Sequence, residues 1–270
     1  MYRVFIVCIA LLLPITARAD DSGLRQELRK LLKENPEIVL DVLRDHSIEV
    51  LEIVEQGVDD RKAAKKRERM ENELENPLEP TINTERPIRG PEDAETTLVA
   101  YSDFLCPYCS EAAATVDEFL AEHPDSVRFQ FKHMPRSSFS LELAKHFEAI
   151  ALQDEEEAWR FHDLIFANQD ELENKKDVAL ATILAELDID NERLAKDLKK
   201  PKLIEFIRSD ATEGNSFGFR GTPSFVLGGV SIQGAQSLEH FEKVHGLLHG
   251  EEGASIGQVE GEECIDCLEE

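Results

Sequence analysis

The feature that most constrains this chain is a Cys-x-x-Cys pair set between an expected strand and an expected helix. The apolar run Leu98 to Tyr101 leads through four residues into Cys106-Pro-Tyr-Cys109. The residues after Cys109 are rich in alanine and place apolar side chains at helical spacing, so the first cysteine is expected where a helix begins. Unpaired backbone N–H groups and the helix dipole favour negative charge there, so this thiol should ionise readily.

This order of elements favours a redox-active dithiol. Cys106 is the expected attacking thiolate, or in the oxidised form the sulfur that a substrate thiol attacks, and Cys109 is the buried resolving thiol one turn into the helix. Pro107 suits a first helical turn, and Pro107 and Tyr108 are expected to tune the thiolate. The alternative is a structural disulfide or half of a zinc site, but no second ligand pair lies at zinc-finger spacing in this domain. Asp103 either assists proton transfer at Cys109 or caps the turn.

The first 19 residues have the pattern of a secretory signal peptide. Arg3 precedes a short apolar core, Val4 to Ile15, and Ala17-Arg-Ala19 is a small-x-small cleavage site. An uncleaved anchor is the alternative. Loss of this segment removes Cys8 and leaves four cysteines in two Cys-x-x-Cys pairs, in a compartment that permits disulfides. We therefore expect a periplasmic or otherwise exported protein.

The charge of the chain limits its partners. Among 270 residues, 56 are acidic and 30 are basic, for a formal net charge of -26. Such an anionic excess argues against binding to nucleic acid or to an anionic membrane surface.

Residues 20–76 form a separate helical segment in the sequence. Asn35-Pro36 interrupts the helical pattern, and the following apolar positions form a stripe of about two heptads. The run from Asp59 to Asn76 is polar on all sides, which is typical of a solvated strut with almost no core residues. We expect an oligomerisation arm on a stalk; the alternative is a helical hairpin folded against the main domain.

The remaining sequence predicts an α/β domain. A proline-rich linker spans 77–91, the domain spans 92–250, and an acidic flexible tail, 251–270, carries Cys264 and Cys267. Lys132, at the end of the second strand, is expected to be exposed. The expected elements are strand 97–103, helix 106–122, strand 127–132, a helical block over about 137–217, strands 221–227 and 230–233 joined by Gly228-Gly229, and helix 237–249.

Two motifs in this domain resemble the DsbA-like branch of the thioredoxin superfamily. They are Ser102-Asp-Phe-x-Cys106-Pro-Tyr-Cys109 and, about 115 residues further on, Gly221-Thr-Pro-Ser-Phe225. The resemblance covers Glu92 to His249 and implies a thioredoxin fold with an inserted helical subdomain. It implies a cis peptide bond before Pro223, facing the dithiol, with Thr222 and Pro223 binding the substrate backbone. It also implies exported protein substrates, a membrane redox partner that resets the dithiol, and no cofactor.

The segment Lys33-Glu-Asn-Pro-Glu-Ile-Val-Leu40 resembles the N-terminal region of ScsC-type proteins (suppressor of copper sensitivity). That resemblance implies oligomers, trimers among them, and favours protein disulfide isomerase or reductase activity over oxidase activity. A monomeric DsbA-like oxidase is one alternative. Another is copper binding through thiolates, for which Cys264 and Cys267 are free soft ligands with His245 and His249 nearby in the sequence. No residue is assigned as a metal ligand. A protein whose helical arm is its main interaction surface is a third class.

Overall fold

The computed structural model describes residues 21–251 and divides the chain into two units, Met1–Arg61 and Lys62–Glu270. The expected signal peptide and the tail with Cys264 and Cys267 lie outside the described residues, so both stay predictions, as does copper binding by the tail. Within the described part, no helix is long and apolar enough to cross a membrane.

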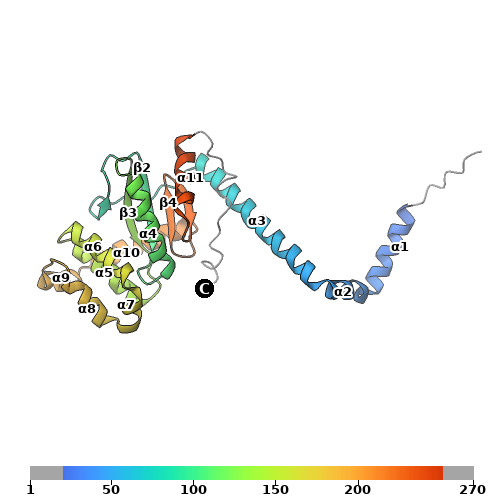
Figure 1. The fold of residues 1–270 in the computed structure, drawn as a ribbon, viewed down its shortest axis with the longest axis horizontal. Coiled ribbons are helices and arrows are strands. Elements are labelled where there is room, and N and C mark those ends of the chain that lie inside the picture. Colours follow the sequence, from blue (N-terminus) through green and yellow to red (C-terminus); the bar gives the residue numbers. More distant parts are fainter. Residues whose placement is uncertain (1–20, 252–270) are drawn as a thin grey trace, which may run out of the picture. The chain divides into compact units, whose positions relative to one another are not determined.

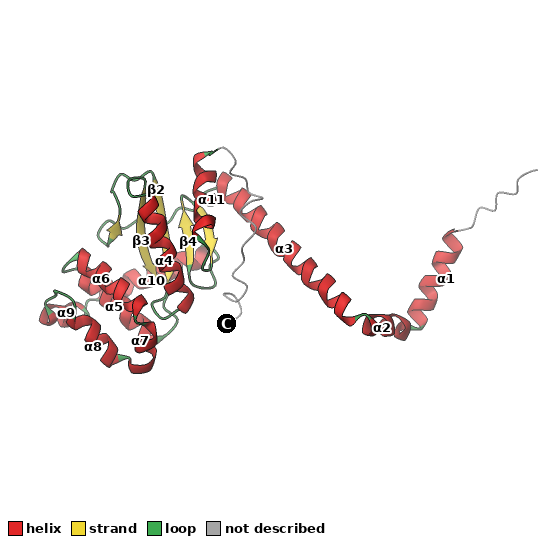
Figure 2. Ribbon diagram, viewed as in Figure 1, coloured by secondary structure: helices red, strands yellow, loops and turns green. Residues whose placement is uncertain are grey.

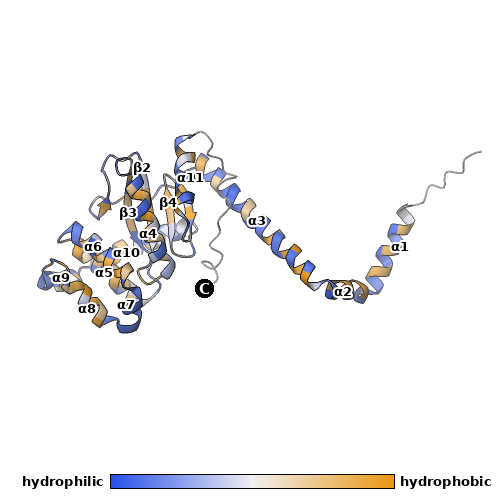
Figure 3. Cartoon of the chain, in the orientation of Figure 1, coloured by the Kyte–Doolittle hydropathy of each residue, from blue (hydrophilic) through white to orange (hydrophobic). Residues whose placement is uncertain are grey.

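The first unit is helical in its described part except at Asn35 and His46. It contains α1 (Asp21–Glu34), α2 (Pro36–Asp45) and the beginning of α3 (Ser47–Glu75) (Figure 1). Asn35 and Pro36 interrupt the helix as expected, and the Asn35 side chain donates to the carbonyl oxygen of Leu31 at 2.9 Å. Many large apolar side chains of these helices are exposed, including Leu24, Leu28, Leu31, Val39, Leu43, Ile48, Leu51 and Ile53. Figure 3 shows apolar positions recurring along α1 and α2.

The second unit is built around a five-stranded sheet of order β1-β3-β2-β4-β5 (Figure 2). The strands are β1 (Ile88–Arg89), β2 (Thr96–Ser102), β3 (Val127–His133), β4 (Ser224–Leu227) and β5 (Val230–Gln233). β2 and β3 are parallel, and the other neighbours are antiparallel. Gly228 and Gly229 join β4 to β5 with φ angles of 54° and 95°. Positive φ at both positions is what a two-residue hairpin of this kind requires, so this predicted turn is confirmed.

Helices cover both faces of this sheet. α4 (Pro107–Glu122) and α11 (Leu238–His249) pack on the face that carries Leu98 and Phe129, and the aromatic rings of Phe119 and Phe241 meet there at 5.7 Å. The opposite face carries Tyr101. Because strand side chains alternate between faces, neighbouring positions of β2 belong to two different cores.

The predicted helical block is present as an inserted subdomain. It contains α5 (Ser138–Ala151), α6 (Glu155–Ala167), α7 (Gln169–Lys175), α8 (Asp177–Ala185), α9 (Asn191–Asp197) and α10 (Pro201–Ser216). α10 approaches the sheet closely at Gly214, where a Cβ atom would lie 2.7 Å from Met134 Sδ and 3.0 Å from a ring carbon of Tyr101. The fold is therefore a thioredoxin fold with an inserted helical region, as the resemblance implied.

The residues predicted to form a linker are held against the domain. The Leu78 amide donates to Gly229 O at 2.9 Å, and β1 pairs with β3. The Arg86 guanidinium is buried between Glu148 and Asp210. The proline content of residues 77–91 predicted a linker, with the domain starting at Glu92. The contacts of Leu78 and Arg86 show instead that residues before Glu92 are packed as part of the domain.

Two charged residues were expected in solvent and are buried instead. Lys132 is 2% exposed, because Nζ donates to Thr81 O at 2.8 Å and pairs with Glu213. Glu73, near the end of α3, is 5% exposed and accepts hydrogen bonds from the Ser231 amide at 2.7 Å and the Ser231 hydroxyl at 2.8 Å. The end of α3 is thus packed, not a solvated strut, because these distant donors compensate the buried carboxylate.

Candidate active site

The dithiol motif lies where β2 ends and α4 begins. Cys106 is the N-cap residue of α4, with an extended backbone, and Pro107 is the first helical residue. Asp103 holds the preceding turn, because its two carboxylate oxygens accept the amides of Leu105 at 2.9 Å and Arg136 at 2.6 Å. These contacts favour the capping role for Asp103 over assistance to Cys109. The first cysteine therefore lies at a helix N-terminus, as the sequence predicted.

The second motif meets the first at the ends of the neighbouring strands β2 and β4. The Thr222–Pro223 peptide bond is cis, and the Cys106 thiol donates to Thr222 O at 3.3 Å. Pro223 and Cys109 line the same small cavity. Pro107 is exposed, and Tyr108 is half-buried. The structure thus brings the predicted residues of the two motifs together, although 116 residues separate the Cys106 sulfur from its hydrogen-bond acceptor.

The two thiols have different environments and opposite pKa shifts. A hydrogen bond from Cys109 lowers the pKa of Cys106 to about 6, with further help from the Thr222 side chain and the backbone amides of Tyr108 and Cys109, and against the opposing effect of burial. Cys109 is 2% exposed, and burial followed by its interaction with Cys106 raises the pKa of Cys109 well above its ordinary value. The arrangement can therefore hold one reactive thiolate beside one protonated thiol near neutral pH.

Sequence reasoning missed residues of the helical insertion that contact the motif. The side-chain amide of Gln169, at the start of α7, donates to Phe104 O and Cys106 O, both at 2.9 Å. The hydroxyl of Ser110 donates to Phe166 O at 3.0 Å. Phe104 itself packs among the aromatic rings of Phe131, Phe147, Phe161 and Phe166. No local pattern marks Gln169, because its hydrogen-bond acceptors lie 63 and 65 residues away.

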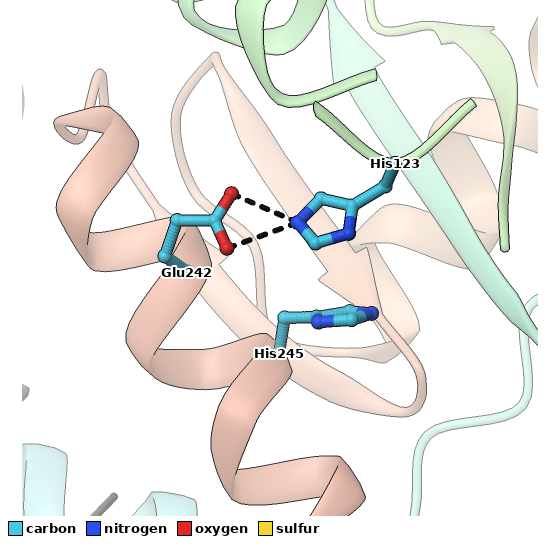
Figure 4. Close-up of side chains that lie close together, drawn as sticks. All are labelled: His123, Glu242 and His245. Carbon is cyan, nitrogen blue, oxygen red and sulfur yellow. Dashed lines mark hydrogen bonds and ion pairs between the residues drawn. The ribbon is translucent and has the colours of Figure 1, made fainter. Parts of the chain in front are cut away.

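Among residues 21–251, one group of side chains is arranged as metal ligands could be. It consists of His123, Glu242 and His245 (Figure 4). His123 is the C-cap residue of α4, at the end of the helix opposite Cys106. His249, which the sequence placed with His245, is hydrogen-bonded to the Thr96 hydroxyl at 3.0 Å.

Comparisons with known proteins agree with this fold. A family model described as Thioredoxin matches residues 83–244. The chain is 36% identical over 162 residues to the Na(+)/H(+) antiporter NhaA of Herminiimonas arsenicoxydans, which is 60% of this chain and 25% of the antiporter. It is 33% identical over 153 residues to NhaA 3 of Salinispora tropica, covering 56% of this chain and 23% of that protein. The chain thus spans about a quarter of the length of these curated relatives.

Two solved structures share the fold over most of their own length. The thiol-disulfide exchange protein α-DsbA2 of Wolbachia pipientis is 20% identical, with a TM-score of 0.56, covering 70% of this chain and 97% of that one. BdbD of Bacillus subtilis is 22% identical, with a TM-score of 0.55, covering 64% of this chain and 98% of that one. At this level of identity the likeness shows a common fold.

Proposed function

This chain belongs to the thioredoxin family, whose model matches residues 83–244, and from that premise we propose that it is an exported thiol–disulfide oxidoreductase acting on protein disulfides. The observation that carries the proposal is the approach of Cys106 to the Thr222 carbonyl at 3.3 Å, with Cys106 at a helix N-terminus. That geometry provides a stabilised thiolate next to a main-chain segment on which an extended substrate can dock.

The reaction follows from the difference between the two sulfurs. In the reducing direction, the Cys106 thiolate attacks a substrate disulfide, one substrate sulfur leaves as a thiolate and takes a proton, and a mixed disulfide forms. Cys109 then loses its proton and attacks Cys106 Sγ, which releases the second substrate thiol and leaves the Cys106–Cys109 disulfide. In the oxidising direction the same steps run backwards. The low pKa of Cys106 makes its sulfur a good leaving group there.

The other residues of the two motifs have supporting roles in this proposal. Thr222 and Pro223 bind the substrate main chain beside the reacting sulfur, and Pro107 and Tyr108 tune the stability of the thiolate. A membrane redox partner resets the dithiol after each cycle. These roles rest on the position of each residue around Cys106, and no cofactor is required for them.

Exchange assays with cysteine variants test the mechanism. Cys106→Ser should abolish both reduction of insulin and refolding of a scrambled disulfide substrate, whereas Cys109→Ser should accumulate mixed disulfides that it cannot resolve. The matched control is the double change Cys264→Ser, Cys267→Ser, which leaves the first pair intact and should retain activity. Exchange by Cys106→Ser at the wild-type rate would exclude the mechanism.

We further propose that the arm formed by α1, α2 and the start of α3 assembles several copies, which favours isomerase or reductase activity over simple oxidation. Its support is the exposure of large apolar side chains, such as Leu43 at 42% and Leu51 at 56%. Short helices with such faces need a partner surface to be stable. That surface is either a second copy or the protein's own domain.

Solution mass distinguishes these two partners. Light scattering should give an oligomer for the full chain and a monomer for a variant lacking residues 20–61, a cut that keeps the buried residues Met70 and Glu73. Leu43→Glu should dissociate the oligomer, and Glu52→Gln, a change of an exposed polar residue of the same arm, should not. A monomeric full chain would contradict the proposal and favour a monomeric oxidase.

A further inference from the structure

A second cluster of reactive side chains lies at the C-terminal end of α4, far along the helix from Cys106. His123, the C-cap residue of α4, faces Glu242 of α11, and His123 Nε2 lies 2.9 Å from both carboxylate oxygens (Figure 4). His245 follows three residues later on α11, which places it on the same face of that helix as Glu242. One ligand atom from each residue lies within 4.8 Å of the others.

The hydrogen bond between His123 and Glu242 leaves the third member of the cluster, His245, without a polar partner at Nε2. This residue is 7% exposed, and its Nε2 is buried with no hydrogen-bond partner. Its ring packs against the rings of His123 and His249, at centroid distances of 4.3 and 4.4 Å. Buried polar atoms are normally satisfied. The His245 imidazole has an unpartnered ring nitrogen, and one of its two ring nitrogens lies within 4.8 Å of ligand atoms of His123 and Glu242, so this buried ring is available to a ligand.

We propose that His123, Glu242 and His245 form a Zn²⁺ site. Two imidazoles and one carboxylate are a donor set used by zinc proteins, and three protein ligands leave a fourth position for solvent or another group. Ligand bonds of about 2.0–2.1 Å place tetrahedral donor atoms about 3.3 Å apart. The ligand atoms here lie within 4.8 Å of one another, so metal binding requires the three side chains to rotate toward a common centre. The metal takes the place of the contact between His123 Nε2 and the Glu242 carboxylate.

The chemistry of the cluster also selects the kind of metal. Ca²⁺ and Mg²⁺ prefer oxygen ligands, and Cu(I) prefers thiolates, whereas imidazole suits Zn²⁺. The site is open to solvent, because the side chains of His123 and Glu242 are 20% and 33% exposed. The net charge of -26 attracts cations to the protein surface. A bound ion joins α4 to α11 without touching the dithiol.

Zinc titration of the full-length protein tests this site. The protein is first oxidised, so that cysteine thiolates do not bind the metal, and is then titrated with Zn²⁺ by calorimetry. We expect one ion per chain, and Glu242→Gln or His245→Gln should each weaken binding at least about tenfold, because even outer-shell partners contribute that much. The matched controls on the same helix are Glu239→Gln and His240→Gln, which lie outside the group and should bind like the wild type.

Two further measurements keep the result interpretable if a variant is destabilised. Circular dichroism checks the fold of each variant, and His240→Gln, also a change at a buried histidine, reports the effect of such a change alone. Replacement of Zn²⁺ by Co²⁺ should give visible absorption bands of a low-coordinate site in the wild type and in both controls, and not in Glu242→Gln or His245→Gln. Equal Zn²⁺ binding by the wild type and all four variants, or no binding by the wild type, would overturn the proposal. The cluster would then be a hydrogen-bonded pair of His123 and Glu242 beside His245, and not a metal site.

Discussion

Arg86→Met is the substitution with the sharpest expected effect on stability. Arg86 lies between two carboxylates, with Nη1 2.7 Å from Asp210 Oδ1 and Nη2 2.6 Å from Glu148 Oε1. The side chains of all three residues are 4% exposed or less. Methionine keeps most of the apolar volume and removes the charge, which leaves two carboxylates buried without their cation. Breaking a buried ion pair in this way costs about 3–5 kcal/mol.

The chain offers a matched control three residues later. Arg89 also joins two carboxylates, Asp117 at 2.8 Å and Asp163 at 2.6 Å, but its side chain is 23% exposed and theirs are 53% and 49% exposed. Exposed pairs of this kind contribute about 1 kcal/mol or less each. Arg89 also lies over the ring of Trp159 at 4.5 Å, a contact worth about 0.5–1 kcal/mol at such a site. Arg89→Met should therefore cost about 1–2 kcal/mol.

Urea unfolding of the oxidised protein at pH 7 measures both costs, with the m-value as a check that the denatured states are comparable. If Arg86→Met costs no more than Arg89→Met, then burial does not set the strength of these ion pairs and the reasoning fails.

The effect of Arg86→Met should also depend on pH in a defined direction. Burial alone would raise the pKa of Glu148, but Arg86 and His133 outweigh it and hold the pKa below its ordinary value of 4.5. A carboxylate with a lowered folded pKa stabilises the protein above its unfolded pKa, and this contribution is lost as the pH falls through the folded value. The difference between wild type and Arg86→Met should therefore be full at pH 7 and narrow below about pH 4.5.

Three further predictions concern the active site and the end of α3. Alkylation of the reduced protein by iodoacetamide should rise with a midpoint near pH 6, so that Cys106 is about nine-tenths thiolate at pH 7; a midpoint above pH 8 would contradict its environment. Because folding lowers that pKa from 9.0, the thiolate should stabilise the folded state of the reduced protein against unfolding. This contribution should be complete above pH 9 and lost as the pH falls through about 6. Glu73→Ala should cost about 1–3 kcal/mol in urea unfolding, because it leaves Ser231 donors buried, while the exposed Glu71→Ala should be near neutral. Gln169→Ala should cost about 1 kcal/mol by the same assay, and a neutral result would show that its two hydrogen bonds do not stabilise the motif.

The elements around the motif were predictable because their determinants are local. An apolar run placed β2, and alternation of apolar and polar residues placed β3, both within a residue or two. Gly228-Gly229 placed the hairpin, and Pro107 marked the start of α4. The meeting of Cys106 with Pro223 is not a local property. It was inferred from the resemblance, and periodicity alone would not have given it.

The buried polar contacts were not predictable, because partners distant in the sequence decide them. Glu73 is buried only because Ser231, 158 residues later, offers two donors. Arg86 lies in a proline-rich stretch typical of a linker, and its acceptors are 62 and 124 residues away. Lys132 is one of the polar positions of the alternating strand β3, so the sequence predicted that it faces solvent. In the structure α10 covers that face of the sheet and supplies Glu213 as a partner. In each case the local sequence correctly shows that the residue is polar. Whether that polar side chain is buried depends on partners that only the fold brings near it.

The two ends of α4 show how one helix can serve two opposite kinds of chemistry. Its aligned peptide dipoles place partial positive charge at the N-terminus, where Cys106 is the cap, and partial negative charge at the C-terminus, where His123 is the cap. The first end favours an anion, which agrees with the lowered pKa of the Cys106 thiol. The second end favours a cation, such as the Zn²⁺ ion proposed above. Because the dipole effect fades within one turn, a metal at His123 should leave the alkylation midpoint of Cys106 unchanged, and a zinc-dependent shift of that midpoint would mean that the two ends are coupled through packing.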